Sequence, residues 1–354
     1  MHLNIIKSSV SMLVVVATMW ASAAQAEPIQ GAGSTFAAPA IGKWAKNYQV
    51  ARTDEGDFTS PDWTVDYEPV GSLAGVLRLI QPEMDFGATD APLPPDEIAK
   101  RGYAQFPILI GGVAIVANIP DVKAGALKLT GQQIADIYLG KIQNWSDAAI
   151  KETNPDLKLP DLRISVLHRK DGSGTTAVFT QFLSNASSEW KTKLGSDQLM
   201  TWPIGAGIEG IQGLTRAVGS ATGSIAYVEH GQVQRAGLAY AQIKNKAGRF
   251  VKPERAAFQA AASAIDWSKT KDFYQQLNDQ PGDASYPLTA ATFAVTPNGR
   301  ISSGRLRRVH DFFRLAFEAK GAEDASGLGY VPLPPALVEM VQRYWEYGNK
   351  KTGG

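Results

Sequence analysis

Three short turns rich in glycine, serine and threonine carry the groups of this sequence that could bind an anion. They are residues 34–36, the pair Gly71-Ser72 and residues 173–175, and each precedes a segment with helical periodicity. The first backbone N–H groups of a helix have no partner inside the helix and carry a partial positive charge, so they attract small anions. Glycine allows close approach to such a ligand, and hydroxyl groups add donors. One such turn is more often a simple helix cap, but three of them predict a common anion site.

Arg169 and Asp171 belong to the most informative stretch, which reads RKDGSGTT over residues 169–176. A guanidinium group can donate two parallel hydrogen bonds to an oxyanion, and a carboxylate two residues later can hold it in place. The alternative is a surface ion pair beside a helix cap. The stretch is not a nucleotide-binding P-loop, because neither Gly-Lys-Ser nor Gly-Lys-Thr follows its glycines.

Asp90 ends the run DFGATD, and its carboxylate predicts which anions the site accepts. A carboxylate repels a neighbouring anion unless that anion still has a proton to donate. Hydrogen phosphate has such a proton near neutral pH, whereas sulfate does not. A fixed acceptor therefore admits hydrogen phosphate and penalises sulfate. The alternative for Asp90 is a turn or helix-capping role.

The composition limits the scaffold that positions these turns. The chain has 354 residues, 35 Lys and Arg against 34 Asp and Glu, 44% hydrophobic residues and no cysteine. This length allows about two domains, each with its own core. The charge balance argues against a strongly basic nucleic-acid binder. The lack of cysteine excludes disulfides, thiol catalysis and cysteine-based zinc sites, and the four histidines lack metal-ligand spacing.

Residues 1–26 have the pattern of a secretory signal peptide. Lys7 precedes an apolar run over residues 12–20, and the small-residue sequence Ala-Gln-Ala ends at Ala26, after which we expect cleavage. A membrane anchor is the alternative, but the apolar run is short of the ~20 residues needed to span a bilayer. The mature chain then has 34 basic and 34 acidic residues. Any anion is therefore held by local geometry and not by a global field.

Strands and helices alternate along the mature chain, which predicts an α/β fold with mostly parallel sheets. Thr130 and Gln133 form a capping-box pattern before one helix. Residues 205–210 match G-x-G-x-x-G, but Pro203 interrupts the strand that a dinucleotide site requires. The strands expected from apolar runs cover residues 65–70, 85–90, 111–119, 164–169, 223–229 and 288–296.

Several of these motifs together resemble one known family. The segments GAGSTF (31–36), DFGATDAPL (85–93), FPILIGGVAIVAN (106–118), IYLGKIQNW (137–145) and RKDGSGTT (169–176) are similar to the periplasmic phosphate-binding proteins of bacterial high-affinity phosphate ABC transporters. The similarity covers essentially the whole mature chain. It implies a type II periplasmic-binding-protein fold with two α/β lobes joined by hinge strands. Lobe I would comprise residues 27–108 plus 284–354, and lobe II residues 109–283. The hinge would pass near residues 108–112 and 286–292.

The resemblance also implies a set of phosphate ligands at the matching positions. Asp90 would accept the phosphate proton, Arg169 would make the charged contact and Asp171 would orient it. Leu73 and Ala74 depart from the very Gly/Ser-rich second turn of the family. The remaining donors would be Thr35, Phe36 through its backbone N–H, Ser72, Ser173, Gly174 and Thr175.

Two functions from different classes follow from such a site. The first is a monomeric periplasmic receptor, without catalysis, metal or cofactor, that passes inorganic phosphate to the transmembrane permease of an ABC transporter with its cytoplasmic ATPase. The second is an exported phosphatase that uses the same donors for a phosphate ester. The sequence favours the receptor, because it contains neither G-x-S-x-G nor H-E-x-x-H and no attacking group is evident.

Overall fold

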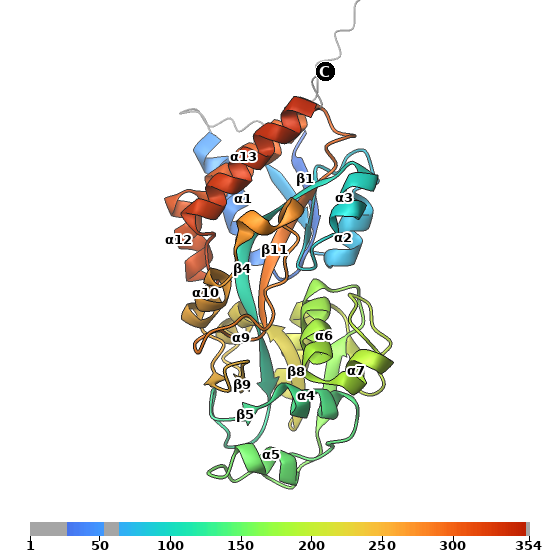
Figure 1. Cartoon of the computed structure of the whole chain (residues 1–354), viewed down its shortest axis with the longest axis vertical. Helices are drawn as coiled ribbons and strands as arrows, with labels where there is room; N and C mark the ends of the chain where they lie inside the picture. The colour runs from blue at the N-terminus through green and yellow to red at the C-terminus, as the bar shows by residue number, and fades with distance from the viewer. Residues whose placement is uncertain (1–26, 53–63, 352–354) are drawn as a thin grey trace, which may run out of the picture.

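The computed structural model of the chain describes residues 27–52 and 64–351, with side chains up to residue 346. The signal peptide expected over residues 1–26 lies outside this part. The described residues form two α/β lobes that lie one above the other along the long axis (Figure 1). Within them, no helix combines the length and the apolarity that crossing a bilayer requires.

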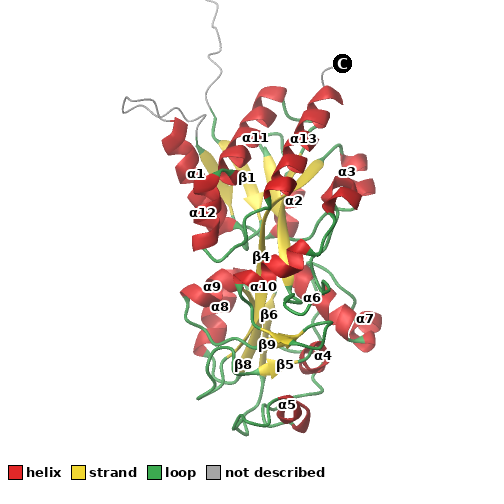
Figure 2. Ribbon diagram, turned by 60° about the vertical axis from the view of Figure 1, so that its left-hand side comes forward, coloured by secondary structure: helices red, strands yellow, loops and turns green. Residues whose placement is uncertain are grey.

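The lobe that contains the first and the last described residues is built on three parallel strands. β1 (Ile29–Gly33) lies between β2 (Val65–Glu68) and β3 (Phe86–Thr89). Figures 1 and 2 show α1 and α12 on one side of these strands and α2 and α3 on the other. The helices of this lobe are α1 (Ala38–Arg52), α2 (Ser72–Arg78), α3 (Pro95–Arg101), α11 (Ser303–Phe317), α12 (Ala319–Gly327) and α13 (Pro335–Lys351).

The other lobe is built on β6 (Ser165–Arg169), which pairs in parallel with β7 (Ala206–Ile208) and β8 (Ser224–Glu229). Figure 2 shows α8 and α9 on one side of these strands and α6 and α7 on the other. A small sheet joins β5 (Lys128–Leu129), β9 (Gln242–Lys244) and β10 (Phe250–Val251). The helices of this lobe are α4 (Gly131–Tyr138), α5 (Ala148–Thr153), α6 (Gly174–Ala186), α7 (Ser188–Lys193), α8 (Gly210–Ser220), α9 (His230–Arg235) and α10 (Arg255–Ser263).

Two long strands, β4 (Ala104–Ala117) and β11 (Thr289–Thr296), connect the lobes. β4 pairs antiparallel with β11 up to Gly112 and with β8 from Val113 onward. The central strand pairs are therefore antiparallel, whereas the sheets of both lobes contain the expected parallel pairs. The register between β11 and β4 shifts between Thr292 and Phe293, which marks an irregularity in the ladder. The hinge and lobe boundaries expected from the sequence stay predictions.

Local signals in the sequence are confirmed at several places. The Thr130 side chain accepts a hydrogen bond from the Gln133 N–H at 3.1 Å, and the Gln133 side chain accepts one from the Thr130 N–H at 2.8 Å. The G-x-G-x-x-G match at residues 205–210 contains β7 instead of following a strand, so it does not form a dinucleotide loop. The core contains the fully buried aromatic side chains of Trp44, Tyr138, Trp145 and Trp190.

Candidate anion-binding site

The ends of β1 and β3 and the start of α2 meet at one point of the first lobe. Gly33 has a φ of 136°, and a Cβ there would lie 2.1 Å from the Ala88 carbonyl oxygen. Only glycine fits this turn without strain. The Ser34 N–H donates to the Ala88 carbonyl at 2.7 Å, and the Gly71 N–H donates to the Gly33 carbonyl at 2.9 Å. These bonds bring residues 34–36, Ser72 and Asp90 to the same edge of the sheet.

Asp90 is buried, and three hydroxyl groups surround its carboxylate. Ser34 Oγ donates to Oδ1 at 2.7 Å, and Thr292 Oγ1 donates to the same oxygen at 2.6 Å. Ser72 Oγ lies 3.5 Å from Oδ2 and accepts the backbone N–H of Asp90 at 3.2 Å. Both strong hydrogen bonds therefore end on Oδ1, and Oδ2 has only a long one.

Burial raises the pKa of Asp90 to about 6, against the lowering effects of the Thr292 and Ser34 hydrogen bonds, the Arg169 charge and the Ser72 hydrogen bond. Removing a carboxylate from water disfavours its charged form, whereas donated hydrogen bonds and a nearby cation favour it. Asp90 is therefore mainly ionised at neutral pH and can act there as a hydrogen-bond acceptor.

Arg169 lies at the end of β6, and its side chain is fully buried. Its Nε donates to Asp171 Oδ1 at 2.6 Å, and its Nη2 donates to Asp171 Oδ2. Asp171 Oδ1 also accepts the Gly210 N–H at 3.0 Å. Burial by itself would raise the pKa of Asp171, but the hydrogen bonds and charge of Arg169 outweigh it and the pKa lies below its usual value. Arg169 is therefore held in one orientation by a charged partner.

The remaining nitrogen of Arg169 points to the other lobe. Its Nη1 donates to Thr35 Oγ1 at 3.3 Å. The Arg169 backbone N–H donates to the Tyr227 hydroxyl oxygen at 3.0 Å, and that hydroxyl lies 2.7 Å from Thr176 Oγ1. Tyr227 thus ties β8 to β6 and to the first turn of α6.

The N-terminus of α6 supplies a second group of donors. Ser173 Oγ accepts the Thr176 N–H at 3.3 Å, and the Ser173 carbonyl accepts the Ala177 N–H at 3.1 Å. The N–H groups of Gly174 and Thr175 are the first two of the helix and have no acceptor within it. Thr175 Oγ1 is buried and has no hydrogen-bond partner among the described residues. The Ser173 N–H donates to the Gln198 carbonyl at 2.8 Å, so only its hydroxyl can serve a ligand.

The two groups of donors face each other across the lobes. A Cβ at Gly174 would lie 2.4 Å from Ser72 Oγ and 2.8 Å from the Asp90 nitrogen. The Leu73 N–H donates to the Gly172 carbonyl at 3.4 Å. Leu73, which departs from the family pattern, therefore makes a contact between the lobes with the N–H that could have served a ligand.

The structure thus brings together the residues expected at the site. Phe36 follows Thr35 before α1, and its carbonyl accepts the Tyr330 hydroxyl at 2.6 Å. Its backbone N–H has no acceptor in the described part of the chain. Three residues near the site, Ser34, Thr292 and Tyr227, are not among the phosphate ligands expected from the sequence. Ser34 was visible in the first turn, but Thr292 and Tyr227 carry no local signal.

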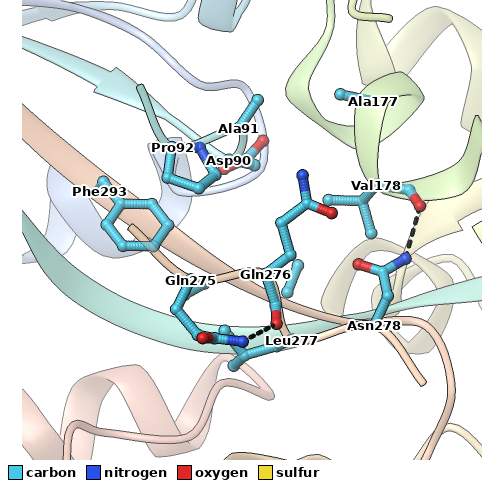
Figure 3. Close-up of a pocket in the computed structure, with 12 residues that line it drawn as sticks. Asp90, Ala91, Pro92, Ala177, Val178, Gln275, Gln276, Leu277, Asn278 and Phe293 are labelled. Atoms are coloured by element: carbon cyan, nitrogen blue, oxygen red, sulfur yellow. Dashed lines mark hydrogen bonds between the residues drawn. The ribbon is translucent and has the colours of Figure 1, made fainter. Parts of the chain in front are cut away.

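A small cavity lies beside Asp90, on the side of the segment 275–278 (Figure 3). Its volume of about 20 Å³ has room for a single water molecule. Figure 3 shows the Gln276 side chain between Asp90 and Val178, and Asn278 Nδ2 donates to the Val178 carbonyl at 2.7 Å. A tetrahedral oxyanion is larger than water, so this cavity is not its site. No cluster of three or more metal-ligating side chains occurs among the described residues.

Comparisons with known proteins identify the family of the chain. Residues 20–312 match the family model of the PBP superfamily domain. The chain is 40% identical to the phosphate-binding protein PstS of Xylella fastidiosa Temecula1 over 317 residues, which cover 90% of this chain and 84% of that protein. The chain belongs to the PstS family. The PstS protein of Pasteurella multocida is 38% identical to it over 97% of both chains.

Solved structures show the same two-lobed fold as this PstS family member. The high-affinity periplasmic phosphate-binding protein PfluDING, solved with phosphate at pH 8.5, has a TM-score of 0.66 and 21% identity, over 89% of this chain and 93% of that one. A putative phosphate ABC transporter substrate-binding protein from Clostridium perfringens, solved with bound phosphate, has a TM-score of 0.62 and 18% identity, over 87% of this chain and all of that one.

Proposed function

We propose that this chain is the periplasmic solute-binding component of an ABC phosphate importer, which binds inorganic phosphate between its lobes and delivers it to the membrane permease. The observation that carries the proposal is the convergence of Thr35, Ser72 and Asp90 from one lobe on Arg169 and the α6 N-terminus of the other. The buried hydroxyl of Thr175, which no described residue satisfies, supports it, because buried polar groups are nearly always hydrogen-bonded.

Each group has a role that follows from its chemistry. Arg169, oriented by Asp171, neutralises part of the phosphate charge. Asp90 accepts the proton of hydrogen phosphate. The hydrogen-bond donors are the Thr35 hydroxyl, the Phe36 N–H, the Ser72 and Ser173 hydroxyls, and the Gly174 and Thr175 N–H groups together with the Thr175 hydroxyl. Donors from both lobes reach the ligand only when the lobes are together, so phosphate favours the closed form by its differential affinity.

Binding without turnover fits the groups at the site better than catalysis does. Nucleophilic catalysis by a hydroxyl and a histidine needs the hydroxyl within reach of the imidazole base. His168 directly precedes Arg169 on β6, but its ring is engaged elsewhere. It stacks on the Trp202 ring, with 4.7 Å between the ring centroids, and its Nδ1 contacts the Arg169 carbonyl oxygen. We therefore propose a receptor that needs no cofactor or metal. Purified protein incubated with p-nitrophenyl phosphate should release no nitrophenol, and turnover that copurifies with the protein would support a phosphatase instead.

The deciding experiment is calorimetric titration of the chain without residues 1–26 with phosphate, arsenate and sulfate at pH 8. We expect phosphate to bind with one site per chain and sulfate to show no binding, because sulfate lacks the proton that Asp90 accepts. Arsenate has the protonation of phosphate and serves as a positive comparison. Equal binding of phosphate and sulfate would reject the proposed selectivity, and no binding of any of the three would reject the function.

The location and the partner require separate experiments in the native cell. Fractionation should recover the processed chain from the periplasm, because residues 1–26 have a cleavable signal pattern. Phosphate uptake by cells that lack this chain should fall and return when the chain is supplied. Uptake unchanged by its removal would contradict the proposed delivery to a permease.

A further inference from the structure

Both short hydrogen bonds to Asp90 end on the same carboxylate oxygen. Ser34 Oγ and Thr292 Oγ1 lie 2.7 and 2.6 Å from Oδ1, whereas Ser72 Oγ lies 3.5 Å from Oδ2. All four residues are buried, so water does not compete for these bonds. The two oxygens of Asp90 are therefore chemically different in this fold.

The position of Thr292 is set by the sheet. β11 pairs antiparallel with β3, and Phe293 lies opposite Thr89. The next position along this register places Thr292 beside Asp90, just beyond the last residue of β3. The register shift between β11 and β4 falls between Thr292 and Phe293. Irregularities of this kind change the direction of a side chain and are frequent next to functional sites. Here the Thr292 hydroxyl points to Asp90 from β11, one of the two strands that connect the lobes.

We propose that Ser34 and Thr292 are positioning residues for anion selectivity: by both donating to Oδ1 of Asp90, they leave Oδ2 as the oxygen that meets the proton of the ligand. This inference rests on the proposed phosphate function. An oxygen that already accepts two hydrogen bonds is a poor site for a proton. When Asp90 is protonated, the proton therefore sits on Oδ2 and the side chain becomes a donor toward the ligand. In that state sulfate loses its disadvantage.

The hydroxyl groups of Ser34 and Thr292 also affect the pH at which Asp90 becomes protonated. Donated hydrogen bonds favour the ionised carboxylate, and together with Arg169 they oppose the effect of burial on the Asp90 pKa. The other ionisable groups that interact with Asp90 are Tyr67, Glu229 and Tyr330. The tyrosines are neutral at the pH values in question, and none of the three is changed in the variants below.

The test measures sulfate affinity between pH 5 and pH 8.5. Sulfate does not change its own protonation in this range, so the pH dependence of its binding reports the protein. For the unchanged protein we expect sulfate binding to appear as the pH falls through about 6. In Thr292→Val the shape is kept and one donor is lost, so this transition should move upward by about one pH unit. Thr292→Ser restores the hydroxyl and should return it to the original pH.

Ser34→Ala should move the transition in the same direction, and the two changes together should move it further. Ser34 Oγ also accepts the Ala37 N–H at 3.1 Å before α1, so its loss removes a helix cap as well. Ser302→Ala removes a similar cap from α11 and leaves the hydrogen bonds of Asp90 intact, so it serves as the matched control with an unshifted transition.

The outcomes separate the two proposals. If the unchanged protein binds phosphate but Thr292→Val leaves the sulfate transition at the same pH, the positioning role is wrong and the proposed function stands. The positioning role is also wrong if Thr292→Val weakens phosphate and sulfate equally at every pH, because a purely structural role predicts that result. If the unchanged protein binds neither anion at any pH, both proposals fall.

Discussion

At Asp90, exchanging one carboxylate oxygen for an amide nitrogen reverses what the side chain offers to a ligand. In Asp90→Asn the amide oxygen keeps the hydrogen bonds from Ser34 and Thr292, so the NH2 group takes the place of Oδ2. We expect phosphate affinity to fall and sulfate affinity to rise, each by roughly tenfold to a hundredfold, because a hydrogen bond to a charged group contributes about 1.5–3 kcal/mol. Competition titration measures both affinities, with exposed Asp66→Asn as control.

Arg169 and Asp171 form a buried ion pair, and its contribution to phosphate binding can be separated from its contribution to the stability of the fold. Arg169→Ala should abolish phosphate binding and also destabilise the fold by roughly 3 kcal/mol, because Asp171 is left without its partner. The double variant Arg169→Ala with Asp171→Ala should recover much of the stability and none of the binding. Urea unfolding and phosphate titration measure the two effects.

Lys170→Ala provides the matched control, because Lys170 is exposed and pairs only at the surface with Glu209. Surface pairs of this kind contribute about 0–1 kcal/mol. Phosphate binding that survives in Arg169→Ala would show that the guanidinium is not the main charged contact.

The first turn of α6 contacts the opposite lobe through a glycine. A Cβ at Gly174 would lie 2.4 Å from Ser72 Oγ, so Gly174→Ala should obstruct closure. Overpacking of this kind costs about 1–3 kcal/mol, and we expect phosphate affinity to fall roughly fivefold to a hundredfold while the fold is kept. Small-angle scattering should show a larger radius of gyration with phosphate than for the unchanged protein.

Gly42 in α1 gives the contrasting case for that experiment. A Cβ there meets nothing within 4 Å, so Gly42→Ala should stabilise the protein by about 0.5–1 kcal/mol and leave phosphate affinity unchanged. If both glycine variants bind phosphate as the unchanged protein does, the contact at Gly174 does not limit closure.

Single elements could be predicted from the sequence where the signals are local. The donor turns at residues 34–36, 72 and 173–175 and the Thr130–Gln133 capping box depend on glycine, hydroxyl groups and helical periodicity, which act over a few residues. The direction of the central strands could not be predicted. A run that is buried along its whole length, as β4 is, looks the same whether its neighbours are parallel or antiparallel.

The site residues that the sequence did not reveal depend on pairing between distant segments. Thr292 meets Asp90 from 202 residues away, and the Tyr227 hydroxyl reaches Arg169 from 58 residues away. Their positions follow from strand register and not from neighbours in the chain. The resemblance to a family implied a proposed ligand set, but it did not indicate which groups would hold those ligands in place.

Over the whole molecule, buried acids make stability depend on pH. Burial raises the pKa of Glu229 from 4.5 to about 7, against the charge of Arg235 and two backbone hydrogen bonds, with Asp90 adding to the rise. An acid with a raised pKa in the folded state contributes stability below its unfolded pKa and loses it as the pH rises through the folded pKa. The loss for Glu229 should be on the order of 3 kcal/mol between pH 4.5 and 8.

Two buried histidines change the stability with pH in the opposite direction. The test must therefore compare the stability of a variant with that of the unchanged protein at each pH. Burial lowers the pKa of His230 and of His310 to about 4, and their contribution falls as the pH drops below 6.5. Relative to the unchanged protein, Glu229→Gln should gain stability from pH 5 to pH 8 in urea unfolding without phosphate. The exposed Glu152→Gln serves as the control for removing a surface carboxylate. If the stability difference between Glu229→Gln and the unchanged protein did not change with pH, the raised pKa of Glu229 would be contradicted.

The pairing of β3 with β11 also dictates the order in which a newly made chain can mature. These strands lie roughly 200 residues apart, and such distant partners are slow to meet. Until β11 has emerged, one edge of the buried strand β3 is bare and open to aggregation. A chain cut short before residue 289 would retain every proposed phosphate ligand in its sequence. It would still lack Thr292 and strand β11, which completes the sheet of the first lobe. The N-terminal part of the proposed site is therefore made first but is among the last parts of the protein to become functional.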